Sequence, residues 1–308
     1  PTGVTFEPGE TASFMDTLVD IFPSNIIAPF ANASMLQVIV AALLFGFGIL
    51  AAGEKGRPAA ALVDSLTEVC MKVMDIILRL SPIGVFCLIL PVVAENGPQI
   101  LGNLGLVLLC AYIGYFLHAV IVYSATVKAL GGVSPLAFFK GMFPAMAMAF
   151  SSASSVGTLP FTLECSERLG ARKEVASFVL PLGATINMDG AAITITIMTL
   201  AAANTLGIQV SLPAAIVLSA MSALGACGAS GVAGGSLLLI PMACSLFGIS
   251  NDVAMQMVGV GFIIGVVQDS VETALNSAGD VEFAATAEYH QWRKQGKPLP
   301  EFLTGKKN

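Results

Sequence analysis

Seven apolar segments, each long enough to cross a lipid bilayer, follow one another along this chain of 308 residues. They lie at about 35–53, 73–94, 104–127, 141–163, 174–205, 213–247 and 253–287. A helix needs roughly 20 mostly apolar residues to span the hydrocarbon core of a bilayer. Hydrophobic residues make up 56% of the chain and charged residues only 11%, against about 25% charged in an ordinary soluble domain. The sequence therefore predicts an all-α membrane protein and excludes a soluble enzyme.

The net charge and the supply of metal-binding residue types exclude two further classes of protein. The formal net charge is −6, whereas a nucleic-acid-binding protein needs a basic surface to displace counterions from phosphates. The six cysteines form no CxxC pair, and His118 and His290 are the only histidines, so neither a zinc site nor a multi-histidine metal centre is expected. We expect the cysteines to pack as small apolar side chains.

The positions of the basic residues indicate how the segments are oriented. Lys and Arg are absent from three of the connecting stretches, 95–103, 204–212 and 246–252. The positive-inside rule places these stretches outside the cell and the basic loops, with the C-terminus, in the cytoplasm. Segment 141–163 then has both ends inside, and segment 213–247 has both ends outside. Because a single crossing cannot return to its own side, we predict two re-entrant helical hairpins of opposite orientation.

Small and polar residues interrupt three of the apolar segments. The first hairpin carries SSASSVGTLP at 151–160 and the second carries GACGASGVAGGS at 225–236, while GATINMDG at 183–190 interrupts segment 174–205. Non-helical backbone at membrane depth is tolerated only where protein or a water-filled cavity satisfies it. The alternative, that the small residues serve only close helix packing, does not account for the flanking charges. The interruptions therefore predict broken helices around a cavity.

A stripe of polar residues runs along one helix face of the last apolar segment, at positions i, i+3, i+4, i+7 and i+11: Asp269, Glu272, Thr273, Asn276 and Asp280. An intramembrane carboxylate costs at least about 2.5 kcal/mol on insertion scales, and neither this segment nor 174–205 contains a Lys or Arg. Such carboxylates become protonated or recruit cations, and oxygen ligands suit hard cations such as Na⁺. We expect Asp189, Asn276 and Asp280 to be functional, and Glu282 only to line water near the surface.

Four motifs, in their order along the chain, resemble those of the glutamate-transporter family, also called the dicarboxylate/amino acid:cation symporter family. They are SSVGTLP at 154–160, NMDG at 187–190, GASGVAG at 228–234 and QDSVETALNSAGD at 268–280. Residues 35–53 and 80–86 are also similar to the fourth and fifth helices of the family. The resemblance therefore covers nearly the whole chain.

The resemblance implies a fold of eight helices and two hairpins, divided into a trimerising scaffold and a moving transport domain. The family's first three helices have no counterpart in this sequence. Residues 1–99 would then form the C-terminal part of the scaffold, 100–290 the transport domain and 291–308 a cytoplasmic tail. The implied assembly is a homotrimer in the inner (plasma) membrane of a bacterium.

The resemblance also implies which residues bind the transported solutes. Co-transported Na⁺ ions would be held at up to three sites by Gly183, Thr185, Asn187, Met188, Asp189, Ala226, Ala229, Asn276 and Asp280. An amino acid would be held by Ser154, Ser155, Met188, Ala191, Val232, Gly234, Asp269, Glu272, Thr273 and Asn276. Within this second set, Asp269 would bind the substrate ammonium and Asn276 the substrate carboxylate.

Two departures from the family pattern predict the substrate. Carriers of acidic amino acids in this family use an arginine and a threonine to bind the side-chain carboxylate of the substrate, and the matching positions here are Glu272 and Ala191. A carboxylate opposite a second carboxylate is repulsive, so glutamate and aspartate should be rejected. The sequence is most similar to the branch of the family that carries serine and threonine, and a Glu272 oxygen can accept the hydroxyl of either. We predict sodium-coupled import of small neutral amino acids by alternating access.

Three other functions are weighed against this prediction. A titratable Glu272 keeps a proton- or sodium-coupled carrier of dicarboxylates or acidic amino acids in consideration, although the missing arginine weighs against it. An ion channel is the alternative from a different class, because a polar interior that binds sodium can conduct it. An intramembrane hydrolase using Ser155 lacks a suitable base, since His118 lies within an apolar run without an acid.

Overall fold

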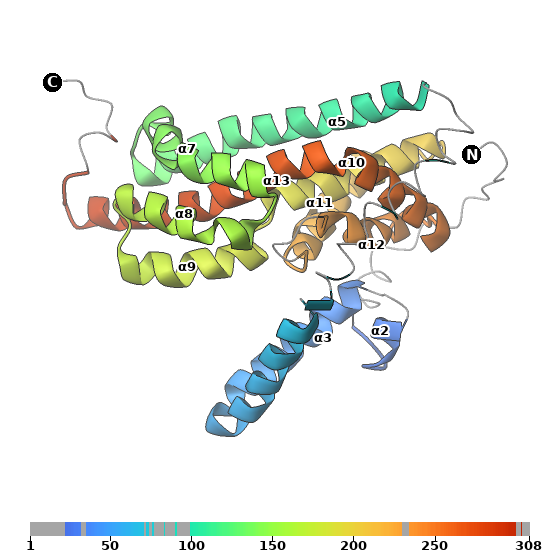
Figure 1. Cartoon of the computed structure of the whole chain (residues 1–308), viewed down its shortest axis with the longest axis horizontal. Coiled ribbons are helices and arrows are strands. Elements are labelled where there is room, and N and C mark those ends of the chain that lie inside the picture. The colour runs from blue at the N-terminus through green and yellow to red at the C-terminus, as the bar shows by residue number, and fades with distance from the viewer. Residues whose placement is uncertain are drawn as a thin grey trace.

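The computed structural model describes residues 22–31, 35–70, 99–229 and 234–299, together with a few isolated positions between and beyond these ranges. The described residues form helices and connecting turns, and no strand occurs among them (Figure 1). The prediction of an all-helical protein is confirmed. Segment 73–94 of the sequence analysis lies almost entirely outside the described residues.

The N-terminal helices expose much of their apolar surface. Helix α2 covers Ala28–Ala31 and α3 covers Met35–Ala51, followed by a short 3₁₀ turn at Gly53–Gly56 and a helix over 57–70. Leucine and phenylalanine side chains along α3 are more than half exposed, and Figure 1 shows α3 projecting from the other helices. Continuous exposed apolar surface of this kind is typical of helices that face lipid or another protein.

One long helix crosses most of the molecule. Helix α5 (Gln99–Leu117) continues without a break through a π-helical turn η2 (His118–Tyr123), α6 (Ser124–Thr126) and a second π-helical turn η3 (Val127–Gly131). Its apolar part, Leu104–Gly131, has 28 residues. By length and composition it can cross a bilayer.

The interrupted helix predicted at 174–205 is present. Helix α9 covers Lys173–Ile186 and α10 covers Asp189–Thr205, so that the helix is broken at Asn187 and Met188. Together α9 and α10 form the second apolar stretch long enough to cross a membrane.

Helices α7 and α8 form the first predicted hairpin. Helix α7 covers Pro135–Ser152 and α8 covers Ser155–Arg168, and the two pack side by side (Figure 1). Ala153 turns the chain with φ of 46°, the only positive φ of a non-glycine residue in the described part of the chain. Ser154 caps α8 by accepting a hydrogen bond from the backbone N–H of Gly157 at 3.1 Å. The tip therefore falls within the small-residue sequence that predicted it.

The second interrupted element begins with α11 (Leu212–Ala226) and returns through a 3₁₀ turn η4 (Ser236–Leu239) and a short helix α12 (Ile240–Ser245). Residues 230–233 of its predicted tip lie outside the described residues. Both α11 and α12 begin with a proline in the first turn, where the missing N–H costs no hydrogen bond. The described part is consistent with a second hairpin.

Helix α13 (Asn251–Lys294) is the centre of the packing and contacts α5, α7, α8, α9, α10 and α12. Its two parts, Asn251–Gly265 and Val267–Lys294, are bent by 84° and together form the third stretch of membrane-spanning character. One apolar cluster surrounds the first part and includes Ile195 and Ile240. A second cluster surrounds the later part and includes Tyr123 and Leu180.

The last turns of α13 form hydrogen bonds with neighbouring segments of the chain. Arg172, in the turn between α8 and α9, donates through Nε and Nη2 to the buried carboxylate of Glu288 at 3.0 and 2.9 Å. These hydrogen bonds raise the pKa of the Arg172 guanidinium. The Tyr289 hydroxyl donates to the Leu169 carbonyl at 2.5 Å, and Arg293 donates to the last carbonyls of η3. These contacts hold the base of the α7–α8 hairpin against α13.

Candidate substrate and ion site

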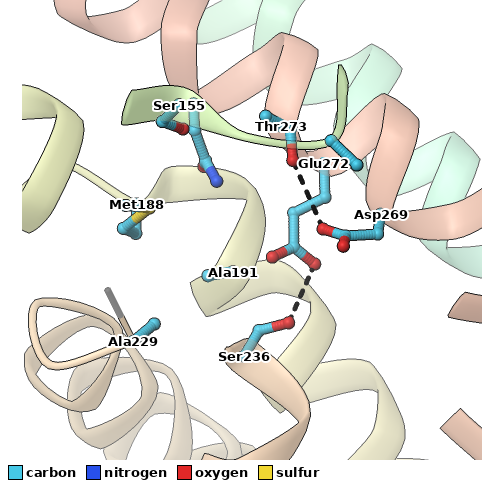
Figure 2. Close-up of a pocket in the computed structure, with 10 residues that line it drawn as sticks. Ser155, Met188, Ala191, Ala229, Ser236, Asp269, Glu272 and Thr273 are labelled. Atoms are coloured by element: carbon cyan, nitrogen blue, oxygen red, sulfur yellow. Dashed lines mark hydrogen bonds between the residues drawn. The ribbon is translucent and has the colours of Figure 1, made fainter. Parts of the chain in front are cut away.

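A small polar pocket lies where the predicted interruptions meet (Figure 2). It is lined by Ala153, Ser155, Met188, Ala191, Ala229, Ser236, Asp269, Glu272, Thr273 and Asn276. These residues come from the tip of the α7–α8 hairpin, the break between α9 and α10, the end of α11 with η4, and the polar stripe of α13. The free volume of about 10 Å³ is close to the space of one water molecule.

Seven of the ten residues expected to bind the substrate line this pocket, and two of the other three, Ser154 and Gly234, lie beside it. Ser154 lies at the hairpin tip, where its hydroxyl caps α8. The backbone N–H of Gly234 donates to Asp269 Oδ2 at 2.9 Å, so Gly234 contacts a pocket residue without lining the pocket. Val232 lies outside the described residues. Sequence reasoning missed Ala153 and Ser236, which complete the lining.

Glu272 is almost fully buried, and its carboxylate is surrounded by hydrogen-bond donors. Its Oε2 accepts hydrogen bonds from Gln268 Nε2 at 2.5 Å, from Ser236 Oγ at 3.1 Å and from the Thr194 hydroxyl. Figure 2 shows the carboxylate between Ala191 and Ser236. No Lys or Arg forms an ion pair with Glu272 in the part of the chain that the structure describes. The pocket is therefore acidic around Glu272, and no Lys or Arg of the described residues neutralises it there.

Asp269 is the second acid in the pocket. Its Oδ2 accepts the Gly234 N–H, and its Oδ1 accepts the Thr273 hydroxyl at 3.3 Å. Two partly satisfied carboxylates that face one small space suit a substrate with an ammonium group.

The amides and carboxylates expected to bind Na⁺ lie together beside the pocket. Asn187 Nδ2 donates to Asp280 Oδ1 at 3.0 Å, and the backbone N–H of Gly190 donates to Asn276 Oδ1 at 2.7 Å. Gly183 lies against the Asp280 carboxylate so closely that a side chain there would collide with it. The carboxylate, the amides and the backbone at the helix break supply the oxygen ligands that hard cations prefer.

Asp189 has two partners that the sequence did not indicate. Its Oδ2 accepts the Tyr123 hydroxyl at 2.8 Å and lies 3.2 Å from His118 Nε2. Both partners lie on the π-helical turn η2.

The remaining residues expected to bind ions differ in how far they are buried. Met188, Ala226 and Ala229 are buried, whereas Thr185 is exposed on α9 and its hydroxyl donates to the Leu182 carbonyl at 2.8 Å. Within the described residues, no cluster of three or more His, Cys, Asp or Glu side chains is arranged to hold a metal ion.

The expectation that Glu282 lines water near the surface is wrong. Its side chain has an exposed fraction of 0%, its Oε1 accepts the Thr286 hydroxyl at 3.2 Å, and its Oε2 has no hydrogen-bond partner. The reason is that α13 continues to Lys294 and packs against η3 along this face. Glu282 lies one helical turn beyond Gly279, on the face that meets η2 and η3.

We expect Gly279→Ala to weaken cation binding strongly. A Cβ at this position would lie 2.6 Å from Tyr123 Oη, 2.9 Å from Asn187 Nδ2 and 3.3 Å from Asp189 Oδ2, so all three groups must move. The rise in melting temperature on adding Na⁺ should become smaller in the variant. Gly105→Ala on α5, where nothing lies within 4 Å of the added methyl group, is the matched control. An unchanged sodium effect in a folded Gly279→Ala protein would contradict the prediction.

Apolar helices of crossing length, a broken helix and a buried polar pocket at the interruptions are together the architecture of a secondary transporter in the membrane. The chain belongs to the sodium:dicarboxylate symporter family, which it matches over residues 2–289. It is accordingly a transporter and not an enzyme, as the sequence predicted. The family, by its description, couples transport to a cation.

Several curated relatives cover most of the chain. A protein of Bifidobacterium adolescentis named serine/threonine transporter SstT is 48% identical over 97% of this chain and 70% of its own length. Proteins of the same name from Streptococcus thermophilus and Streptococcus agalactiae are 42% and 44% identical, over 88% and 91% of this chain and 67% and 69% of their own lengths. The resemblance stated from the motifs is confirmed.

Proposed function

We propose that the protein imports L-serine and L-threonine together with Na⁺ by alternating access. The observation that carries the proposal is the acidic environment at Glu272, which accepts hydrogen bonds and is neutralised by no Lys or Arg in the part of the chain that the structure describes. An acidic substrate would be repelled there, whereas a hydroxyl can donate to the carboxylate. The names of the relatives support the same substrates.

In this proposal each end of the substrate has its own partner. Asp269 binds the ammonium group, Asn276 binds the carboxylate with the help of the hairpin tip at Ser155, and Glu272 accepts the side-chain hydroxyl. Ala191, with its small side chain, lies beside Glu272 and favours substrates with one or two side-chain carbon atoms.

The proposed Na⁺ ions are cargo that binds beside the amino acid. Asp280, with Asn187, Asn276 and the backbone of Gly183, forms one site, and Asp189 with Asn187 contributes to another. Met188, with backbone carbonyls at the end of α11, contributes to a third. Because a cation in these sites would share the amides that contact the substrate, binding of the two solutes would be mutually favourable.

We propose that the element from α11 to α12 is the gate. The pocket has room for about one water molecule in the described conformation, so serine enters only when part of the wall moves. Two hydrogen bonds join this element to the acids of α13, from Gly234 N–H to Asp269 and from Ser236 to Glu272. The α7–α8 hairpin is by contrast fixed to α13 through Glu288 and Tyr289.

The arrangement in the membrane is also part of the proposal. Residues 1–99 belong to the scaffold of a homotrimer, 100–290 form the moving transport domain, and 291–308 are a cytoplasmic tail. The two interrupted elements are re-entrant hairpins that open toward opposite sides of a bacterial inner membrane. The basic residues between 168 and 173 and after 292 support a cytoplasmic location for those segments.

Uptake of labelled serine into liposomes that contain the full-length protein should require Na⁺. It should survive collapse of the proton gradient, because the expected ligands suit a hard monovalent cation. Serine should also protect the protein from heat better with Na⁺ present than without it. Undiminished uptake after choline replaces sodium would refute the coupling, and flux that does not saturate with serine would favour a channel.

A further inference from the structure

The carboxylate of Glu272 is held by groups from three separate elements. Thr194 on α10, Ser236 on η4 and Gln268 on α13 all donate to the same oxygen, Oε2. None of these hydrogen bonds uses Oε1. All three donors are at least nine-tenths buried, with exposed fractions of 2 to 3%, so water does not compete for the carboxylate at these contacts.

Tyr115 on α5 forms a second layer behind this contact. Its hydroxyl lies 2.6 Å from Thr194 Oγ1 and accepts from Gln268 Nε2 at 2.7 Å. The Thr194 hydroxyl has one proton, and it lies within hydrogen-bonding distance of both Glu272 Oε2 and the Gly190 carbonyl, the latter at 3.1 Å. When that proton is donated to Glu272, Tyr115 donates to Thr194, and the hydrogen bonds run in one direction from Tyr115 through Thr194 to Oε2.

We propose that Tyr115, Thr194, Ser236 and Gln268 are positioning residues for hydroxyl recognition, and that they hold Oε2 so that Oε1 is presented to the hydroxyl of the substrate. This inference rests on the proposed function and adds the residues that set its specificity. A site built to hydrogen-bond a substrate hydroxyl rejects an analogue without one, because its own buried group is then left unpaired. Discrimination between a substrate with a hydroxyl and one without it requires that the Glu272 carboxylate stays in one orientation.

Ser236 connects the same carboxylate to the gate. It lies on η4, and its hydroxyl joins Glu272 in the described conformation. The Glu272 side chain therefore takes part both in recognising the substrate hydroxyl and in closing the gate. A substrate that engages Oε1 leaves the Ser236 contact at Oε2 intact, so that the gate closes over serine or threonine with this hydrogen bond made.

The test measures how well the protein distinguishes serine from alanine, which differs only in lacking the hydroxyl. Inhibition by alanine of sodium-dependent uptake of labelled serine is measured in liposomes for the wild type, for Thr194→Val and for Thr194→Ser. The valine variant keeps the shape and loses the donor, and the preference for serine should fall by about tenfold, the effect of one hydrogen bond to a charged group. The serine variant keeps the hydroxyl and should retain the preference.

Ser236→Ala provides an independent variant on the gate side, and it should also reduce the preference, whereas Ser236→Thr should retain it. Ser222→Ala on α11 is the matched control, because Ser222 is fully buried and its hydroxyl has no hydrogen-bond partner. The melting temperature with and without Na⁺ shows which variants are folded. If Thr194→Val does not fold, the preference of the Ser236→Ala protein for serine over alanine tests the inference instead.

Folded Thr194→Val or Ser236→Ala protein with the wild-type preference for serine would overturn the inference, as would an equal loss in Thr194→Ser. The proposed function fails in a different way, through wild-type protein that shows no sodium-dependent uptake of serine. The two failures are therefore distinguished by the wild-type measurement alone.

Discussion

The double variant Glu272→Arg, Ala191→Thr is expected to bind aspartate and to lose most of its affinity for serine. Arginine can bind a carboxylate through two parallel hydrogen bonds, and one hydrogen bond to a charged group is worth roughly 1.5–3 kcal/mol. Removing Glu272 deletes a repulsive charge at the same time, so both effects act in one direction. A gain in aspartate affinity of about 10- to 100-fold corresponds to these energies.

The surroundings of Glu272 can accommodate the exchange. Thr194, Ser236 and Gln268 now donate to the carboxylate, and their hydroxyl and carboxamide oxygens can accept from a guanidinium instead. Serine binding should fall because a buried arginine without an anionic partner disfavours the neutral complex.

Competition of aspartate against labelled serine, for both single variants and the double, measures this change. Ala191→Thr alone should do little, since one neutral hydroxyl does not offset the carboxylate that remains. A double variant that folds, binds Na⁺ and still shows no aspartate binding would mean that Glu272 does not occupy the side-chain end of the pocket.

Asp280→Asn is expected to lower sodium affinity by at least tenfold, about 1.4 kcal/mol, while leaving the fold intact. The change preserves the shape of the side chain, and an oxygen remains for the hydrogen bond from Asn187 Nδ2. It removes a carboxylate that is 3% exposed and that forms no ion pair with a Lys or Arg among the described residues. Burying a charge without a partner is costly, so stability without Na⁺ should not decrease.

The measurement is the melting temperature in detergent as a function of sodium concentration. Asp252→Asn is the control, because Asp252 is an exposed acid in the first turn of the same helix and should leave the sodium dependence unchanged. An Asp280→Asn protein with ordinary stability and wild-type sodium affinity would exclude Asp280 as a ligand.

Much of the architecture follows from the sequence because its causes are local. The NMDG break at 187–190 and the turn at Ala153 lie where small or polar residues interrupt apolar helices. The spacing from Asp269 to Asp280 places these residues on one face of α13. In the structure the face is buried except at Asp269, which is half-buried, and all of its polar residues except Asp280 line the pocket. Helix ends were less predictable, since α13 extends well beyond 253–287.

The partners of the polar stripe could not be read from the sequence. Tyr115 and Thr194 occupy ordinary positions in apolar helices, and only the packing of α5 and α10 against α13 brings them to the site of Glu272. Gln268 lies one helical turn before Glu272 on the same helix. His118 and Tyr123 reach Asp189 for the same reason. The burial of Glu282 could not be predicted either, because it depends on which segments pack over α13. These contacts depend on how helices distant in the sequence pack together, and the periodicity of the sequence does not predict that packing.

The absence of Lys and Arg between 174 and 292 has an electrical consequence. If the proposed transport domain carries Asp189, Asp269, Glu272 and Asp280 across the bilayer, it would move whatever negative charge these groups retain through the membrane potential. Each elementary charge moved across 100 mV involves about 2.3 kcal/mol. Bound Na⁺ would cancel part of that charge on the inward journey, whereas the empty domain would return with its carboxylates uncompensated. In a cell with a negative interior the voltage would then assist the return, so the resting potential, and not only the sodium gradient, would set the rate of the transport cycle.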